Sequence, residues 1–523
     1  MRAAAPLLVA LALLASSSVR ATGFTDVGDD IEAADEAGFE LDGYLRTRGE
    51  LLWNLDLDRG PTPSGALFFP VPLDDPNGQL LTHADLRFRA DVMGVVPDWG
   101  IAAKLRVDLL DNLTLGSGPV GPPGTSTSQG SPASAIVVRR AYGEVLLPFG
   151  LLAAGRMGAH WGLGMLSNGG DCADCDSGDS SDRIAFLTPL AGHIWALAYD
   201  FSASGPLTAR TDERRVVDVD PTDDVRTVTF AVLSWETDLA RERRRRADRA
   251  TFEYGLLASY RWQENDVPAT YLPLATDVVI DGAQVMHRGL SAFAGDLWFR
   301  LTLPSFRVEL EAAVLWSKIE QPSLVPGVYL REPVESLQFG VALESEYEAL
   351  AGDLGVGLDA GFASGDATPG FGAFPTLDDA EPQPGELNGA QAVPPWDNRA
   401  DNFRFHPDYR VDRILFRELI GTVTDAFYFR PHLRWRAVRL GDGGLDLGLA
   451  ALAAFAVQVA STPGGALPLG IELDPTVAYV HGGGFTAALE YALLVPLDGL
   501  DNPALGLGAQ PAQSLRLRLM YRF

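Results

Sequence analysis

The sequence predicts an all-β protein: a single closed antiparallel transmembrane β-barrel of about eighteen strands, with short turns at one end and long loops at the other. Three observations predict it. The last segment has one apolar and one charged face, no apolar run is long enough for a membrane helix, and two-faced segments recur in pairs along the chain.

The final segment, residues 513–523, alternates strictly in polarity. Successive side chains of a strand point to opposite faces. One face therefore carries Leu515, Leu517, Leu519, Tyr521 and Phe523, and the other carries Arg516, Arg518, Met520 and Arg522. A barrel wall uses such a strand directly, with lipid outside and a wet lumen inside.

No segment after the N-terminus approaches the roughly 18–20 consecutive apolar residues that a membrane helix requires. The closest, 447–459, is interrupted by Gln458. A closed barrel is the remaining way to cross a bilayer, because closure pairs every backbone N–H and C=O group.

Two-faced segments continue along the chain and alternate between tight turns and Gly/Pro-rich loops. Residues 239–248 are read as one of the turns. If the segment 183–190 is not a strand, sixteen strands remain. The predicted strands are 40–54, 83–95, 101–111, 135–147, 149–161, 183–190, 193–203, 225–237, 250–264, 289–303, 305–319, 335–350, 353–364, 426–438, 443–459, 468–480, 484–496 and 513–523.

The N-terminus predicts export. Arg2 precedes an apolar stretch, and a cut after Ala21 would follow small residues, which is typical of a signal peptide over residues 1–21. Residues 22–39 then form a short acidic segment, expected in the periplasm, and residues 40–523 form the barrel. The net charge of −28 argues against nucleic-acid binding, which needs a basic face.

Charged side chains share the polar parity of many strands and are expected to line the lumen, where opposed charges bias which ions pass. The alternative is that neighbouring strands simply pair them. The predicted lining residues are Arg46, Arg48, Arg87, Arg89, Arg106, Arg156, Arg261, Arg300, Arg430, Arg434, Arg436, Arg516, Arg518, Asp85, Asp91, Asp108 and Asp296. Tryptophans at predicted strand ends are expected at the membrane interfaces: Trp53, Trp99, Trp235 and Trp316.

The loop 169–182 holds both cysteines. In an oxidising compartment, Cys172 and Cys175 favour a disulfide over a zinc site, for which no further soft ligands stand nearby. A Ca²⁺ site at Asp174, Asp176 and Asp179 is the alternative, although no glutamate closes the pattern. No other metal or cofactor is expected.

No residue is assigned as a catalyst. His160 and Ser167 are seven positions apart and of opposite parity, so they do not form the base–nucleophile pair of a barrel lipase.

The loop 365–425 is the longest. Pro407 suits a first helical position, and Val411, Ile414, Leu415 and Leu419 follow at helical spacing, so a short helix is expected there. Such a segment would fold into or over the lumen and narrow it.

The final strand resembles the terminal strand of bacterial outer-membrane barrels, which ends on phenylalanine after apolar residues at every second position. The loop 169–182 and the runs 405–412 and 421–425 resemble an uncharacterised family of large Gram-negative outer-membrane barrel proteins. That resemblance spans nearly the whole mature chain. It implies fold and location, and brings no substrate or catalytic residues with it.

The sequence therefore predicts an outer-membrane, porin-like channel for passive diffusion of small solutes or ions. Two alternatives are an export or uptake porin specific for an anionic saccharide or polymer, and a plugged structural or adhesive barrel. Expected partners are outer-membrane lipid and, through the strand that ends at Phe523, the barrel-assembly machinery. The sequence is compatible with a homotrimer and with a monomer.

Overall fold

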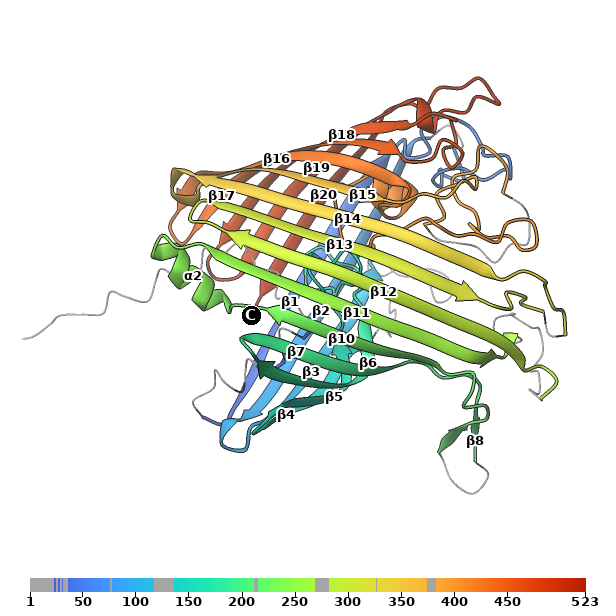
Figure 1. The fold of residues 1–523 in the computed structure, drawn as a ribbon. Coiled ribbons are helices and arrows are strands. Elements are labelled where there is room, and N and C mark those ends of the chain that lie inside the picture. Colours follow the sequence, from blue (N-terminus) through green and yellow to red (C-terminus); the bar gives the residue numbers. More distant parts are fainter. Residues whose placement is uncertain are drawn as a thin grey trace, which may run out of the picture.

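The computed structural model describes residues 23–24, 27–28, 31, 36–75, 78–116, 136–210, 215–268, 282–325, 327–373 and 382–523. Within them, eighteen strands form one closed antiparallel barrel, so the predicted eighteen rather than sixteen is confirmed (Figure 1). The strands are β1 (Gly38–Trp53), β2 (Leu80–Val96), β3 (Ile101–Thr114), β4 (Ile136–Leu147), β5 (Gly150–Gly158), β6 (Ser180–Leu190), β7 (His193–Ala203), β10 (Val225–Ser234), β11 (Thr251–Asp266), β12 (Met286–Thr302), β13 (Phe306–Ile319), β14 (Val334–Ala349), β15 (Leu354–Ala363), β16 (Ala426–Leu440), β17 (Gly443–Ala456), β18 (Pro468–His481), β19 (Phe485–Pro496) and β20 (Ala512–Arg522).

The barrel closes where β1 pairs with both β2 and β20. In the β1–β20 register Arg48 lies opposite Arg518, and Gly43 and Phe523 exchange two backbone hydrogen bonds of 3.2 Å. Closure leaves no free sheet edge, which is the condition for crossing hydrocarbon. None of the helices in the described part of the chain is long and apolar enough to span a bilayer.

The two faces of the wall have opposite character, as the final strand predicts. On β20, Leu517 and Tyr521 are 47% and 50% exposed on the outside, whereas Arg516 is 4% exposed inside. The outer face is apolar on other strands too, for example at Leu256 and Leu449. An apolar exterior around a closed barrel is the form of an outer-membrane β-barrel protein.

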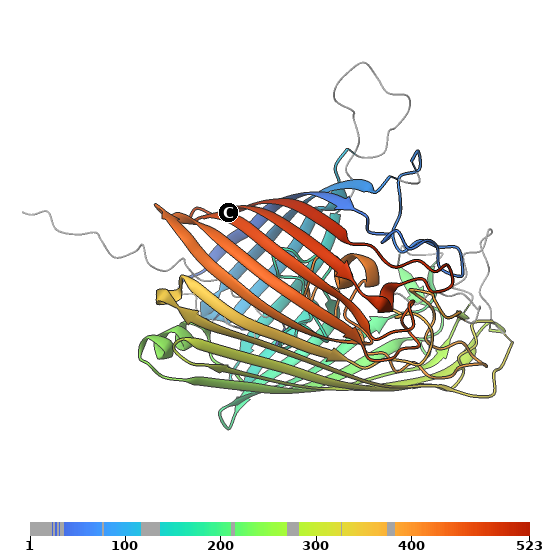
Figure 2. The same ribbon diagram turned by 90° about the horizontal axis from the view of Figure 1, so that it is seen from above.

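Long loops gather at one end of the barrel and tight turns at the other (Figures 1 and 2). The turn between β6 and β7 is Ala191–Gly192, both with positive φ, as a two-residue hairpin turn requires. The predicted turn 239–248 contains the helix α2 (Asp238–Arg246), because the Thr237 hydroxyl accepts a hydrogen bond from the Ala240 N–H and caps it.

Short elements complete the fold. A small hairpin, β8 (Leu207–Ala209) and β9 (Val216–Asp218), extends from the long-loop end. The others are the 3₁₀ turns η1 (Pro97–Trp99), η3 (Leu350–Gly352) and η5 (Asp498–Leu500), and the π-helix η4 (Leu415–Ile420).

Three of the four tryptophans lie exposed near strand ends, namely Trp53, Trp99 and Trp316. Trp235 does not. Its ring lies beside that of Trp298, tilted by 39° with ring centroids 5.7 Å apart, under the guanidinium of Arg300. Trp298 is only 2% exposed, on the inner face of β12, so Trp235 packs inward rather than toward lipid.

The N-terminal segment enters the barrel. Phe24 and Ile31 are 5% and 4% exposed, and pack with Val95 and Leu151 in one apolar cluster. Arg183 lies over the Phe24 ring at 5.1 Å. Phe24 and Ile31, from the segment expected in the periplasm, therefore lie inside the turn-side mouth, whereas Phe39 at the start of β1 is 73% exposed. The predicted signal peptide, residues 1–21, lies outside the described residues.

Candidate functional site: a constricted lumen

The cysteine-containing loop between β5 and β6, residues 159–179, folds into the lumen; we call it the disulfide loop. Cys172 and Cys175 form a disulfide (S–S 1.99 Å). The carbonyl oxygen of Cys175 accepts hydrogen bonds from Arg46 Nη1 (2.9 Å) and Arg87 Nη1 (2.7 Å). Both arginines are fully buried, so the loop covers this part of the wall.

The carboxylates of the disulfide loop are bound by arginines. Arg48 contacts Asp174 (3.1 Å) and Asp176 (2.6 Å), and Asp174 also pairs with Arg417 and with Arg516 (2.9 Å). Burial opposes ionisation of Asp174, but Arg417 and Arg516 outweigh it and hold the pKa of this carboxyl well below its usual range. The oxygens proposed from the sequence as Ca²⁺ ligands thus accept guanidinium hydrogen bonds.

Asp179, the third residue of that calcium proposal, lies apart from this cluster. Its carboxylate accepts from the Asn168 N–H (3.3 Å) and lies 3.4 Å from His406 Nε2. His160 organises the same loop, because its Nδ1 accepts a hydrogen bond from the Gly169 N–H (3.2 Å). Burial lowers the pKa of His160, which keeps the ring neutral for this role.

Most other predicted lining residues also face inward, each with a partner nearby. The pairs are Arg89–Asp108, Arg106–Asp91, Arg48–Asp85, Arg261–Thr227, Arg300–Glu253, Arg430–Asp359, Arg434–Glu346, Arg436–Asp446, Arg518–Glu490 and Trp161–Asp296. Pairing between strands, the plainer alternative, accounts for many of these charges.

Arg156 is an exception, and the prediction that it lines the lumen is wrong. The inner face of β5 carries Leu151, Ala153 and Met157, all buried. Arg156 has the opposite parity and pairs with Asp182 (2.8 Å) on the outer side of the wall. The reason is that this sector of the lumen is packed with apolar groups, so the usual polar-inside pattern reverses there.

The long loop, residues 364–425, supplies a second lumen segment. Its residues Phe403, Phe405, Leu415 and Phe416 are at most 2% exposed, and pack with inward-facing residues of the wall such as Tyr428. The loop does contain a short helix, as predicted, but this helix is the π-helix η4, which begins at Leu415 rather than near Pro407.

A wall carboxylate fixes where that helix starts. Glu472 of β18, fully buried, accepts hydrogen bonds from the N–H groups of Arg413 (2.8 Å), Ile414 (2.9 Å) and Leu415 (2.9 Å). Asp412 caps the following turn through the N–H of Phe416 (2.7 Å). These acceptors satisfy the donors that a helix start leaves unpaired.

The disulfide loop has an equivalent anchor across the barrel. Glu311 of β13 accepts from the N–H groups of Leu163 (2.5 Å), Met165 (3.3 Å) and Leu166 (3.0 Å). The two loops also bind each other. Asp408 accepts from the N–H groups of Asp176 (2.7 Å) and Ser177 (3.0 Å) and from the Ser177 hydroxyl (2.9 Å). The constriction is therefore one connected unit.

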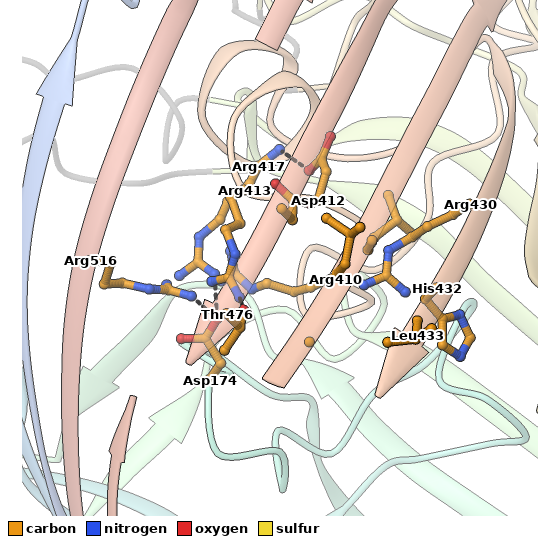
Figure 3. Close-up of a pocket in the computed structure, with 15 residues that line it drawn as sticks. Asp174, Arg410, Asp412, Arg413, Arg417, Arg430, His432, Leu433, Thr476 and Arg516 are labelled. Atoms are coloured by element: carbon orange, nitrogen blue, oxygen red, sulfur yellow. Dashed lines mark hydrogen bonds and ion pairs between the residues drawn. The ribbon is translucent and has the colours of Figure 1, made fainter. Parts of the chain in front are cut away.

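Beside these loops lies a cavity of about 270 Å³, lined by β16, β17, β18, the long loop, Asp174 and Arg516 (Figure 3). Five arginines reach it: Arg410, Arg413, Arg417, Arg430 and Arg516.

A second cavity, of about 190 Å³, adjoins the first. Arg410, Val411, Arg430 and His432 line both, so the two spaces meet between the long loop and β16.

Sequence reasoning missed the arginines of the long loop. The helix predicted in this loop rests on its apolar positions alone. Its arginines also recur every three or four residues, at Arg410, Arg413 and Arg417, and this spacing would place them on one side of a helix.

No protein-family model matches the chain, and neither does any curated protein sequence. Among solved structures, it is similar to OccK9 (OpdG) of Pseudomonas aeruginosa, with 13% identity, a TM-score of 0.46, and coverage of 93% of this chain and 98% of that one. It is also similar to OpdK of Pseudomonas aeruginosa (10% identity, TM-score 0.44, covering 92% and 99%) and to a BenF-like porin of Pseudomonas fluorescens Pf-5 (9%, 0.42, covering 93% and 98%). The closed wall, the apolar exterior and the loops folded into the lumen together give the chain the architecture of an outer-membrane-type β-barrel.

Proposed function

We propose that the protein is a passive channel for small anionic solutes. The observation that carries this proposal is the convergence of five arginines, from three separate parts of the chain, on one cavity in the constricted lumen. A ring of fixed positive charge lowers the energy of an anion in the pore and raises that of a cation.

The residues that line the cavity carry more positive than negative groups, namely five arginines and the carboxyls of Asp174, Asp412 and Asp474. Carboxylates beside the cavity also bind some of these arginines, for example Asp359 on Arg430 (2.6 Å), Asp176 on Arg410 (2.6 Å) and Glu490 on Arg413 (3.0 Å). Burial raises the pKa of Asp412 to about 7, so this group carries less than a full negative charge at neutral pH. Burial and the nearby Arg417 lower the pKa of Arg410, and an anion between the two guanidinium groups would relieve that repulsion.

The dimensions favour a small solute. A volume of about 270 Å³ is below the roughly 300–1,000 Å³ of pockets that hold drug-sized ligands. A sugar acid or another small organic anion is thus a better match than a folded polymer. Arg87 is fully buried behind the disulfide loop, so it is unavailable to a passing solute, whereas Arg410 and Arg430 line the passage.

Reversal potentials in a planar bilayer under a KCl gradient test the proposal. We expect the reversal potential of the wild type to be displaced from zero toward the equilibrium potential of chloride, which indicates that chloride permeates better than potassium. Removing one charge about 4 Å from an ion changes its energy by about 1 kcal/mol at the dielectric of water, or about fivefold in occupancy. Arg410→Ala with Arg413→Ala should therefore lower the chloride-to-potassium permeability ratio by at least about fivefold.

The control is Arg156→Ala, which removes one guanidinium charge from the outer face. It should leave the potential unchanged. Cation selectivity in the wild type, or an equal shift in the control, would contradict the proposal.

A second candidate, a plugged barrel with a structural role, is favoured by the inward packing of Phe24 and of both loops. It predicts no conductance at all, so the same bilayer recordings distinguish the two.

We also infer that the terminal strand is the contact for barrel-assembly machinery. Phe523 is 51% exposed and stacks on Phe88 (ring centroids 5.5 Å apart) at the seam. Deleting Phe523 should reduce the yield of heat-modifiable barrel in the outer membrane. Native electrophoresis of the same preparation would show whether the barrel is a homotrimer.

A further inference from the structure

A group of carboxylates lies outside the lumen, in the loop between β7 and β10 that carries the β8–β9 hairpin (Figure 1). One oxygen each of Asp218, Asp223 and Asp224 lies within 4.8 Å of the other two. In the part of the chain that the structure describes, this is the only group of three or more His, Cys, Asp or Glu side chains so arranged.

Asp223 is the member that points to a ligand. It is 4% exposed, and its Oδ1 has no hydrogen-bond partner. Its backbone is held in place, because the carbonyl oxygen accepts from Gln263 Nε2 (2.8 Å) on the wall. A Cβ at Gly205 would collide with both carboxylate oxygens, so glycine makes room for this side chain. Burying a carboxylate without a partner is costly unless a cation is supplied.

Among the described residues, the cations near this group are bound to carboxylates other than Asp223. Arg226 binds Asp224 (Nη2–Oδ2 3.1 Å). Arg288 is already paired with Asp266 (2.5 Å). Burial and then the neighbouring carboxylates raise the pKa of Asp223 to about 6, which reflects their mutual repulsion.

We propose that Asp218, Asp223 and Asp224 bind a Ca²⁺ ion at the external rim of the barrel. Oxygens that share a Ca²⁺ at about 2.3–2.6 Å lie no more than about 5 Å apart, which this group satisfies. Ca²⁺ takes 6–8 oxygen ligands and accepts an irregular site completed by water, whereas Mg²⁺ demands near-octahedral geometry. An all-oxygen set also disfavours zinc, which prefers nitrogen and sulfur.

The bound ion would fasten the hairpin to the barrel. Asp218 is the last residue of β9, and Asp224 directly precedes β10, so one cation would join the base of the hairpin to the wall. Sites of this kind on extracellular modules bind Ca²⁺ with dissociation constants of about 10⁻⁴–10⁻³ M.

Equilibrium dialysis of the refolded, chelator-treated barrel in detergent against about 1 mM ⁴⁵Ca²⁺ tests the site. Asp223→Asn should remove one bound Ca²⁺ per chain. The matched control, Asp98→Asn in the exposed turn η1, should keep it. Equal binding by the wild type and Asp223→Asn, loss in the control, or equally tight binding of Mg²⁺ would overturn the proposal.

Limited proteolysis gives a second, independent readout. Arg215 is exposed and directly precedes β9, so trypsin cleavage after it reports on the order of the hairpin. Ca²⁺ at about 5 mM should slow this cleavage at least about fivefold in the wild type, and should not slow it in Asp218→Asn or Asp223→Asn. Heat-modifiable migration confirms that each variant has folded. Cleavage at the same rate with and without Ca²⁺ in the folded wild type would reject the site.

Discussion

The contact between the two lumen loops gives the sharpest test of the constriction. Asp408→Ala removes a fully buried carboxylate that accepts three hydrogen bonds from the disulfide loop, two from backbone N–H groups of Asp176 and Ser177 and one from the Ser177 hydroxyl, besides a longer one (3.4 Å) from Arg410 of its own loop. Hydrogen bonds to charged groups contribute about 1.5–3 kcal/mol each. In the variant, water in the lumen can bond to the freed N–H and hydroxyl groups and recover part of this free energy. We therefore take a net loss of about 1 kcal/mol for each bond, or about 3 kcal/mol in all.

A loss of about 3 kcal/mol raises the population in which the loops are separated by about 100-fold. Single-channel recording should show this as frequent steps to a higher conductance, because Arg410 and the π-helix are no longer held against the disulfide loop. The control is Glu386→Ala. It removes a similar tie between loops, to the N–H (2.6 Å) and hydroxyl (3.0 Å) of Ser64, but at the exposed surface.

If Asp408→Ala forms a folded barrel whose conductance histogram matches that of the wild type, the loops do not set the width of the pore. If Glu386→Ala produces the same steps, the effect is a general loosening of external loops. Either result would refute the reasoning.

Three further predictions follow from other contacts. Phe24→Ala with Ile31→Ala should detach the N-terminal segment and raise the mean conductance, since each truncation costs about 2–5 kcal/mol of packing in a buried site. Cys172→Ser with Cys175→Ser should increase open-channel current noise, because the disulfide holds the carbonyl groups that bind the wall arginines. The apparent melting temperature should fall as pH rises from about 4 to about 8, and Asp425→Asn should weaken that fall. Burial raises the pKa of Asp425 from 3.8 to about 8, so in this range the folded state keeps a proton that the unfolded state has lost.

Each of these has a contrary outcome. An unchanged conductance in the Phe24/Ile31 variant would mean that the segment does not obstruct the pore. Current noise equal to the wild type after loss of the disulfide would show that the hydrogen bonds alone fix the loop. A melting curve in Asp425→Asn with the same pH dependence as the wild type would assign the effect to other buried carboxyls.

The wall of this protein was predictable because each strand encodes its own two faces. The alternation in 513–523 predicts both the apolar exterior and the inward arginines, and the weak strand 183–190 is present as β6. The rule failed at Arg156, where the inner face of β5 packs against apolar groups brought from elsewhere in the chain. Parity in one strand cannot reveal what fills the lumen beside it.

The constriction was predictable only in part. The long loop was expected to fold inward, and it does so. The sequence predicts a disulfide in the loop 169–182 but not the contacts of this loop with the wall, where its aspartates and carbonyl groups are bound by Arg46, Arg48 and Arg87. Such contacts join residues about 90–130 positions apart in the sequence, which local patterns do not encode.

The anchors of the disulfide loop bear on how the barrel is completed. The disulfide loop leaves β5 but docks on Glu311 of β13, and its Asp174 docks on Arg516 of β20. Whatever the order in which the strands are added, both anchors are in place only when β5, β13 and β20 belong to one wall. We therefore expect the disulfide loop to complete its docking only as the wall closes, so that an incomplete barrel has a wider lumen than the finished one.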